Sequence, residues 1–176
     1  MNTDLFLLFG ALGLATAAAV VDVRQQRIPN RLTYPALGIG LLLRIFFYGW
    51  HGLLTGLEGM VLAGGIIFVF YVVRAMGAGD LKLMAAIGSV VGPQYAFTTL
   101  LATGIAGGVL AVVYVLYRGQ MRATLSNMGS VMKFHAWSGL QVHPELNLDN
   151  PAALRMPYGL AIAAGAFYTF VAACWR

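Results

Sequence analysis

Two carboxylates stand where an apolar chain offers them little water. Asp80 follows Gly77 and Gly79 between two long apolar runs, and Asp22 ends the first apolar run. An ionisable residue at a membrane boundary is costly unless it has a partner or water, and it usually has a function. Two such groups brought together favour an aspartyl dyad, in which one keeps a proton while the other is anionic.

The chemistry expected of such a dyad is hydrolysis by activated water. The anionic carboxylate takes a proton from a water molecule that attacks a carbonyl carbon, and the protonated one donates to the developing oxyanion or to the leaving amine. No metal and no cofactor are required. The deeper Asp80 favours the protonated role, whereas the nearby ammonium of Lys82 favours its anion, so the sequence leaves the assignment of base and acid open.

Each aspartate also has a structural interpretation. Asp80 could simply cap the helix that begins at Leu81, its carboxylate accepting a backbone N–H. Asp22 could be an interfacial charge paired with Arg24 or Arg27. The dyad interpretation is favoured by the combination of two carboxylates on one side of the membrane with a Gly-x-Gly turn before one of them.

The amino-acid composition indicates that most of the chain is surrounded by lipid. Of the 176 residues, 60% are hydrophobic and 10% charged, and the mean hydropathy is +0.78. These values indicate a polytopic membrane protein of the all-α class, one domain over residues 1–176, whose main partner is the lipid bilayer and not a nucleic acid. Cys174 is the only cysteine, which excludes an intrachain disulfide or a cysteine-ligated zinc site. The oligomeric state is left open.

Apolar runs predict about six membrane-spanning helices. The expected spans are Leu5–Val21, Ala36–Trp50, Gly52–Val73, Leu81–Gly92, Tyr95–Tyr117 and Tyr158–Trp175. Nine of the eleven Lys and Arg residues then fall in three loops on one side, which the positive-inside rule assigns to the cytoplasm. Both termini are therefore expected outside. The last of these loops, residues 118–156, is predicted to hold an interfacial helix over Met121–Met132, with Trp137 following.

The spans differ in length. Leu81–Gly92 gives about 18 Å of helix, against an apolar core of about 30 Å, so residues 77–79 are expected to be irregular backbone below the membrane surface. The first helix is expected to continue to about Arg27, because the residue before Pro29 disfavours helical angles. Its face above Asp22 carries small residues that should let another helix, such as the one starting at Asp80, pack closely. These are Ala11, Ala15, Ala18 and Ala19.

The remaining charged residues are interpreted as structural. Arg44 and Glu58 each lie seven residues from His51, the expected turn between the second and third spans, and are predicted to form an ion pair. His135, His143 and Glu145 match no familiar metal-ligand spacing and are expected to be solvated loop residues.

Three motifs together resemble the type IV prepilin peptidases, which are GxGD-type intramembrane aspartic proteases. They are Asp22 with Ile28-Pro29-Asn30, Gly77-Ala78-Gly79-Asp80-Leu81-Lys82, and Pro157-Tyr158-Gly159. The resemblance extends over nearly the whole chain and is nearest to the short branch that serves Flp/Tad-type pili. It implies the GxGD protease fold, Asp22 and Asp80 as the catalytic pair, and the other motif residues as support. Larger members also methylate their product through a segment with paired cysteines, which is not expected here.

The resemblance also implies a substrate and a location. The expected substrate is a prepilin or pseudopilin whose basic leader stays cytoplasmic, cleaved at the inner membrane of a bacterium. Two other classes of function are kept: a proton-coupled membrane transporter, which would usually place its carboxylates near the midplane of inverted repeats, and a non-catalytic subunit of a pilus or secretion assembly.

Overall fold

The structure, a computed structural model, describes residues 3–119, 121–144, 146 and 156–175. These residues form helices and no strand, so the all-α prediction is confirmed for the described part of the chain. The helices are α1 (Thr3–Gln25), α2 (Asn30–Val72), α3 (Ala78–Arg118), α4 (Met121–Ser138) and α5 (Gly159–Cys174).

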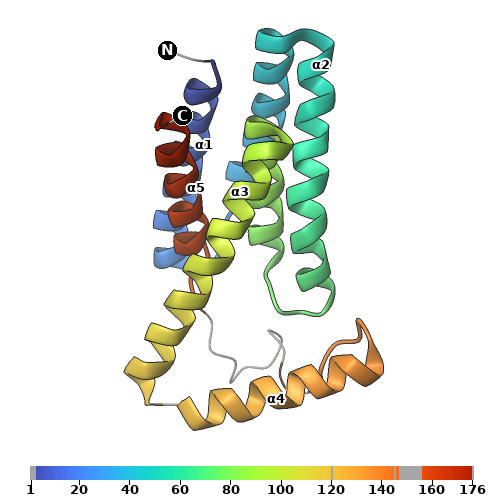
Figure 1. Ribbon diagram of the computed structural model, residues 1–176, viewed down its shortest axis with the longest axis vertical. Coiled ribbons are helices and arrows are strands. Elements are labelled where there is room, and N and C mark those ends of the chain that lie inside the picture. The colour runs from blue at the N-terminus through green and yellow to red at the C-terminus, as the bar shows by residue number, and fades with distance from the viewer. Residues whose placement is uncertain (1–2, 120, 145, 147–155, 176) are drawn as a thin grey trace.

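Helices α2 and α3 are each bent back on themselves. Non-helical backbone angles interrupt α2 at Gly49 and α3 at Gly92, where φ is 62° and 77°. Both values lie in the region that glycine adopts without strain, and Pro93 removes a backbone donor at the second bend. Each helix therefore forms two antiparallel limbs, visible in Figure 1. The limbs correspond to the second to fifth expected spans.

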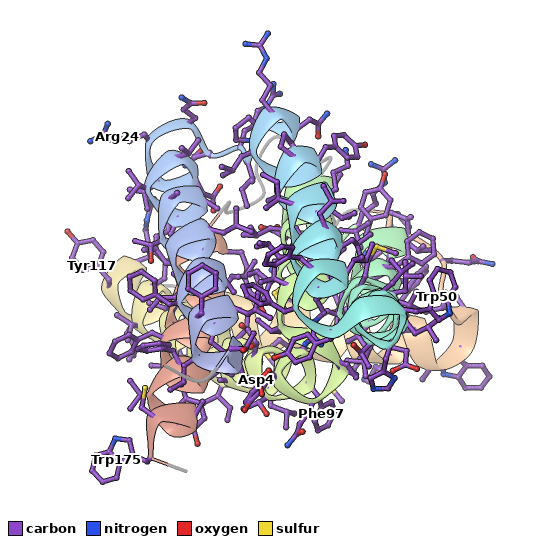
Figure 2. All side chains as sticks on the ribbon, turned by 90° about the horizontal axis from the view of Figure 1, so that it is seen from above. Asp4, Arg24, Trp50, Phe97, Tyr117 and Trp175 are labelled. Atoms are coloured by element: carbon purple, nitrogen blue, oxygen red, sulfur yellow. The ribbon has the colours of Figure 1, made fainter. Side chains whose placement is uncertain are left out.

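The apolar character of these helices is that of a membrane protein. Within the described residues, α1, α2 and α3 are long and apolar enough to cross a membrane, and α5 is a shorter apolar helix. Large apolar side chains project from the outside of the bundle, among them Trp50, Tyr117 and Trp175 (Figure 2). The number of membrane crossings, six, and the orientation of the termini stay predictions.

Three expected boundaries were wrong by a few residues. Helix α1 ends at Gln25 and not near Arg27, because Gln26 takes a positive φ of 50°. Helix α2 begins directly after Pro29, six residues before the expected span. Helix α3 begins at Ala78, so the irregular backbone expected at residues 77–79 is limited to Gly77, since the Asp80 side chain caps the first turn.

The first limb of α3, from Ala78 to the bend at Gly92, is the centre of the bundle. Its side chains from Leu83 to Val91 are nearly all buried, as expected of a helix that is apolar on every face. The second limb of α2 crosses it so closely that a Cβ on Gly88 would collide with the carbonyl of Gly59. This limb carries Asp80 at its start, about one turn before the buried stretch that begins at Leu83.

The small-residue face of α1 is buried as expected. Ala11, Ala15, Ala18 and Ala19 are at most 4% exposed. Their main neighbour, however, is α5, and α3 is a lesser one. The last helix of the chain therefore lies beside the first (Figure 1), which brings the start of α5 to the end of α1 that carries Asp22.

The predicted ion pair between Arg44 and Glu58 is wrong. The turn of α2 is at Gly49 and not at His51, so Arg44 lies five residues before it and Glu58 nine after it. Thr55, six residues after the turn, has the matching depth, and its Oγ1 accepts a hydrogen bond of 2.9 Å from Arg44. The guanidinium also donates to the carbonyl oxygen of Val90 at 3.0 Å, whereas Glu58 is exposed. Arg44 thus supplies a hydrogen-bond donor to a backbone carbonyl next to the bend of α3.

The two ends of the bundle differ. Helix α1 begins and α5 ends at one end, and α4 lies across the other (Figure 1). Helix α4 extends the predicted segment Met121–Met132 to Ser138, with Met121, Met128 and Met132 exposed. Its position at a membrane surface stays a prediction.

Arg44→Met should lower the thermal midpoint in detergent by roughly 3–10 °C, because the Val90 carbonyl loses a charged hydrogen-bond donor inside the bundle. Glu58→Gln should leave the midpoint unchanged, since the side chain is exposed. Scanning fluorimetry of the two variants checks this. Equal losses in both would favour the rejected ion pair.

Candidate active site

Asp22 lies in the last turn of α1 and is held by the start of α5. Its side chain is 6% exposed. Its Oδ2 accepts a hydrogen bond of 2.9 Å from the backbone N–H of Gly159. This N–H is among the first of α5, which have no partner within the helix and carry the positive end of its dipole. A buried carboxylate is thereby given one strong donor.

Asp80 lies in the first turn of α3. Its Oδ2 accepts a hydrogen bond of 3.2 Å from the backbone N–H of Gly77, the residue that precedes the helix. Asp80 is therefore not the N-cap of a helix that begins at Leu81, as considered from the sequence, but the third residue of α3, whose side chain reaches back to cap the N-terminal residue Gly77. The side chain is half-buried. Capping uses one carboxylate oxygen, and it is compatible with a second, chemical role.

The two carboxylates face one cavity of about 780 Å³. The wall is completed by the chain between α2 and α3, by the second limb of α3 and by Tyr158. The structure therefore brings together two residues that are 58 positions apart in sequence and belong to different helices.

Glycines let the backbone approach the dyad. A Cβ on Gly159 would lie 3.0 Å from both Cβ and Oδ2 of Asp22, and one on Gly79 would lie 3.0 Å from Cβ of Ile28. The second contact joins the segment after α1 to the start of α3. Gly79 and Gly159, two of the three glycines of the predicted support set, therefore set how closely these segments approach each other.

Lys82 lies on the outer side of this junction. Its Nζ donates to Oδ1 of Asn30 at 2.9 Å and lies 4.9 Å from the ring centroid of Tyr34. Pro29 precedes the first residue of α2. The ammonium considered from the sequence as a neighbour of Asp80 thus links α3 to the start of α2, and these motif residues support the site from outside.

The Pro157-Tyr158-Gly159 motif lies against the second limb of α3. A Cβ on Gly107 would lie 2.8 Å from Cε2 of Tyr158, so the aromatic ring rests on this glycine. Sequence reasoning missed Gly107 and its neighbour Gly108, which also lines the cavity. The adjacent glycines inside the fifth expected span were the available signal for a close approach at that level.

No group of three His, Cys, Asp or Glu side chains able to hold a metal occurs among the residues that the structure describes. The rings of His135 and His143 both contact Phe134, with centroid distances of 5.5 and 4.8 Å. Nδ1 of His135 lies 2.9 Å from the carbonyl oxygen of Val131. Glu145, the third residue considered from the sequence, lies outside the described residues.

Comparison with known proteins gives relatives that are named prepilin leader peptidase/N-methyltransferase. A prepilin leader peptidase/N-methyltransferase of Xanthomonas campestris pv. campestris is 28% identical over 138 residues, which cover 73% of this chain and 48% of the relative. One of Legionella pneumophila is 30% identical over 125 residues, covering 68% and 44%. One of Stutzerimonas stutzeri is 29% identical over 146 residues, covering 74% and 49%.

The chain thus spans about half the length of these curated relatives. No solved structure gives a significant match. The model of the type IV leader peptidase family matches residues 8–112, a range that includes both Asp22 and Asp80. Because this match covers more than half of the chain, the chain belongs to the type IV leader peptidase family.

Proposed function

We propose that the protein is an intramembrane aspartic endopeptidase that removes the leader peptide of a type IV prepilin or pseudopilin. The observation that carries the proposal is the pair of carboxylates, Asp22 and Asp80, on one cavity at the end of a buried helix. Family membership and the names of the relatives support the substrate class. The proposal covers leader cleavage and not methylation. More specifically, we propose that the substrate is a prepilin of the Flp/Tad type.

The proposed mechanism uses the dyad and water. One carboxylate is anionic and takes a proton from a water molecule, which attacks the carbonyl carbon of the scissile peptide bond. The other carboxylate is protonated and donates to the developing oxyanion, and a proton then reaches the leaving amine. Backbone amides hold one oxygen of each carboxylate, which fixes both groups before the substrate arrives.

The proposed location is the cytoplasmic face of a bacterial inner membrane. The segment after α1, the start of α2 and the start of α3 meet at one end of the bundle, through Gly79 with Ile28 and through Lys82 with Asn30. Arg24, Arg27, Arg31 and Arg74 belong to the same end. This gathering of basic residues supports a cytoplasmic dyad, six crossings and external termini. The exposed methionines of α4 support an interfacial position for that helix.

A proton-coupled transporter is the alternative from another class. It would use the same carboxylates but would need access to them from both membrane faces. The dyad at one end of the bundle, next to the loop between α2 and α3, favours the peptidase. A non-catalytic assembly subunit would need no dyad at all, and cleavage of a prepilin by the purified protein separates both alternatives from the proposal.

Asp22→Asn and Asp80→Asn should each reduce prepilin cleavage by at least 1,000-fold, because an amide keeps the size and the bond to the backbone N–H but exchanges no proton. The double variant should be no worse than either single one, since groups of one catalytic unit are non-additive. Gel analysis of a purified prepilin in detergent measures the product. Normal turnover by either folded single variant would exclude the dyad.

Gly159→Ala should reduce cleavage by about 100-fold while the protein still folds, because the added methyl group displaces the Asp22 carboxylate by a fraction of an ångström. Gly13→Ala is the matched control on α1, where an added Cβ meets no atom within 4 Å. A Gly159→Ala enzyme as active as Gly13→Ala would show that the position of Asp22 is not critical.

The cleavage rate should have a bell-shaped dependence on pH. At low pH both carboxylates are protonated and no base is present, and at high pH both are ionised and no acid is present. The two limbs belong to the pair and not to single residues. Initial rates from pH 4 to 9 at saturating prepilin test this, and a flat profile would contradict a dyad that shares one proton.

A further inference from the structure

The hydroxyl of Tyr158 has no role in the fold as described so far. Tyr158 precedes α5 and lines the cavity that holds the dyad. Its side chain is half-buried, yet its hydroxyl forms no hydrogen bond with any residue that the structure describes. A half-buried phenol on a cavity wall can donate its hydrogen bond to a group that enters the cavity. Its partner is therefore to be sought in the cavity.

Two contacts fix where this hydroxyl lies. The ring rests on Gly107, and a Cβ there would lie 3.1 Å from the hydroxyl oxygen, so the second limb of α3 prevents the side chain from turning toward it. Asp80 lines the same cavity as Tyr158. The next residue, Gly159, donates its N–H to Asp22. Tyr158 is thus next in sequence to the residue that holds Asp22, and it shares the cavity wall with both aspartates.

A substrate in this cavity needs hydrogen-bond donors. A peptide must be extended to be cleaved, and its carbonyl groups then lose the partners they had in a helix. The ionised carboxylate of the proposed dyad only accepts hydrogen bonds, and the protonated one donates to the oxygen of the scissile bond itself. Among other donors on the cavity wall, Gln26, Arg27 and Arg74 are exposed to solvent. Tyr71 is half-buried, but it belongs to the end of α2.

We propose that the Tyr158 hydroxyl donates a hydrogen bond to a backbone carbonyl of the substrate next to the scissile bond. Tyr158 is then a substrate-binding residue, and Gly107 is a positioning residue that holds its ring. The phenol is protonated at neutral pH and remains a donor throughout the reaction. Because the bond is made equally before and during the chemical step, it should act on KM and leave kcat nearly unchanged. This inference rests on the proposed peptidase function.

The test compares steady-state kinetics of Tyr158→Phe and wild type on a purified prepilin. Loss of one neutral hydrogen bond should raise KM by about 3- to 10-fold, with kcat within twofold. Tyr168→Phe, on the exposed face of α5, is the matched control for losing a phenol and should leave both constants unchanged. Tyr71→Phe tests the competing hypothesis that Tyr71, the other phenol on the cavity wall, donates this hydrogen bond.

A second variant tests the placement of the ring. Gly107→Ala should raise KM by a similar factor, because its methyl group would push the Tyr158 ring aside. Gly104→Ala, one turn earlier and with no atom within 4 Å of the added Cβ, should not. In the Tyr158→Phe background, Gly107→Ala should add little to KM, since the hydroxyl is already absent.

Several outcomes would overturn the inference. They are an unchanged KM for Tyr158→Phe, a KM effect confined to Tyr71→Phe, and a fall in kcat above 100-fold at constant KM, which would indicate a part in the chemistry instead. Any of these can be seen only if the wild-type protein cleaves the prepilin. Failure of the wild type would count against the proposed function itself, so the two failures are distinguishable.

Discussion

The fold depends on a buried helix that is too short to span the membrane. The backbone N–H and C=O groups at its two ends therefore need hydrogen-bond partners. The first limb of α3 runs from Ala78 to the bend at Gly92, roughly 22 Å of helix in a bilayer whose apolar core is about 30 Å thick. In lipid, backbone groups freed at helix ends need partners from the protein. The structure supplies them with ionisable side chains. Asp80 accepts the Gly77 N–H at one end, and Arg44 donates to the Val90 carbonyl at the other.

This arrangement explains why a carboxylate can lie at such depth. Asp80 contributes to the stability of the limb on which it sits, so its burial is offset by the bond to backbone that it makes. Asp22 has an equivalent arrangement with the first turn of α5. In both cases a helix start provides the donor, which is the standard means of stabilising a negative charge where water is scarce. The two carboxylates are thus positioned by the ends of different helices, and their separation is set by how those helices pack.

Packing at the dyad in turn rests on residues without side chains. Gly159 against Asp22, Gly79 against Ile28 and Gly107 against Tyr158 are contacts that a methyl group would tighten or break. The sequence allowed the aspartates, the apolar runs and the glycine turn to be found, since these depend on local composition and spacing. The sequence suggested the helix that starts at Asp80 as the partner of α1, whereas α5 is its main neighbour, because α3 and α5 both offer small residues. The Arg44 partner was missed because a turn at Gly49 in place of His51 changes which residues share a depth.

A short helix also has a consequence for water. The chain between α2 and α3 turns at the start of this short limb, and that turn lines the cavity next to Asp80. A full-length helix would place its first residue at the surface, where a carboxylate is solvated and shares no proton with a neighbour. In the proposed peptidase, the same truncation that makes Asp80 cap the helix would give it the partly dry, partly open environment in which two carboxylates can differ in protonation. Stability of the limb and reactivity of the proposed dyad would then have one structural cause, and substitutions that lengthen or recap this helix would alter both together.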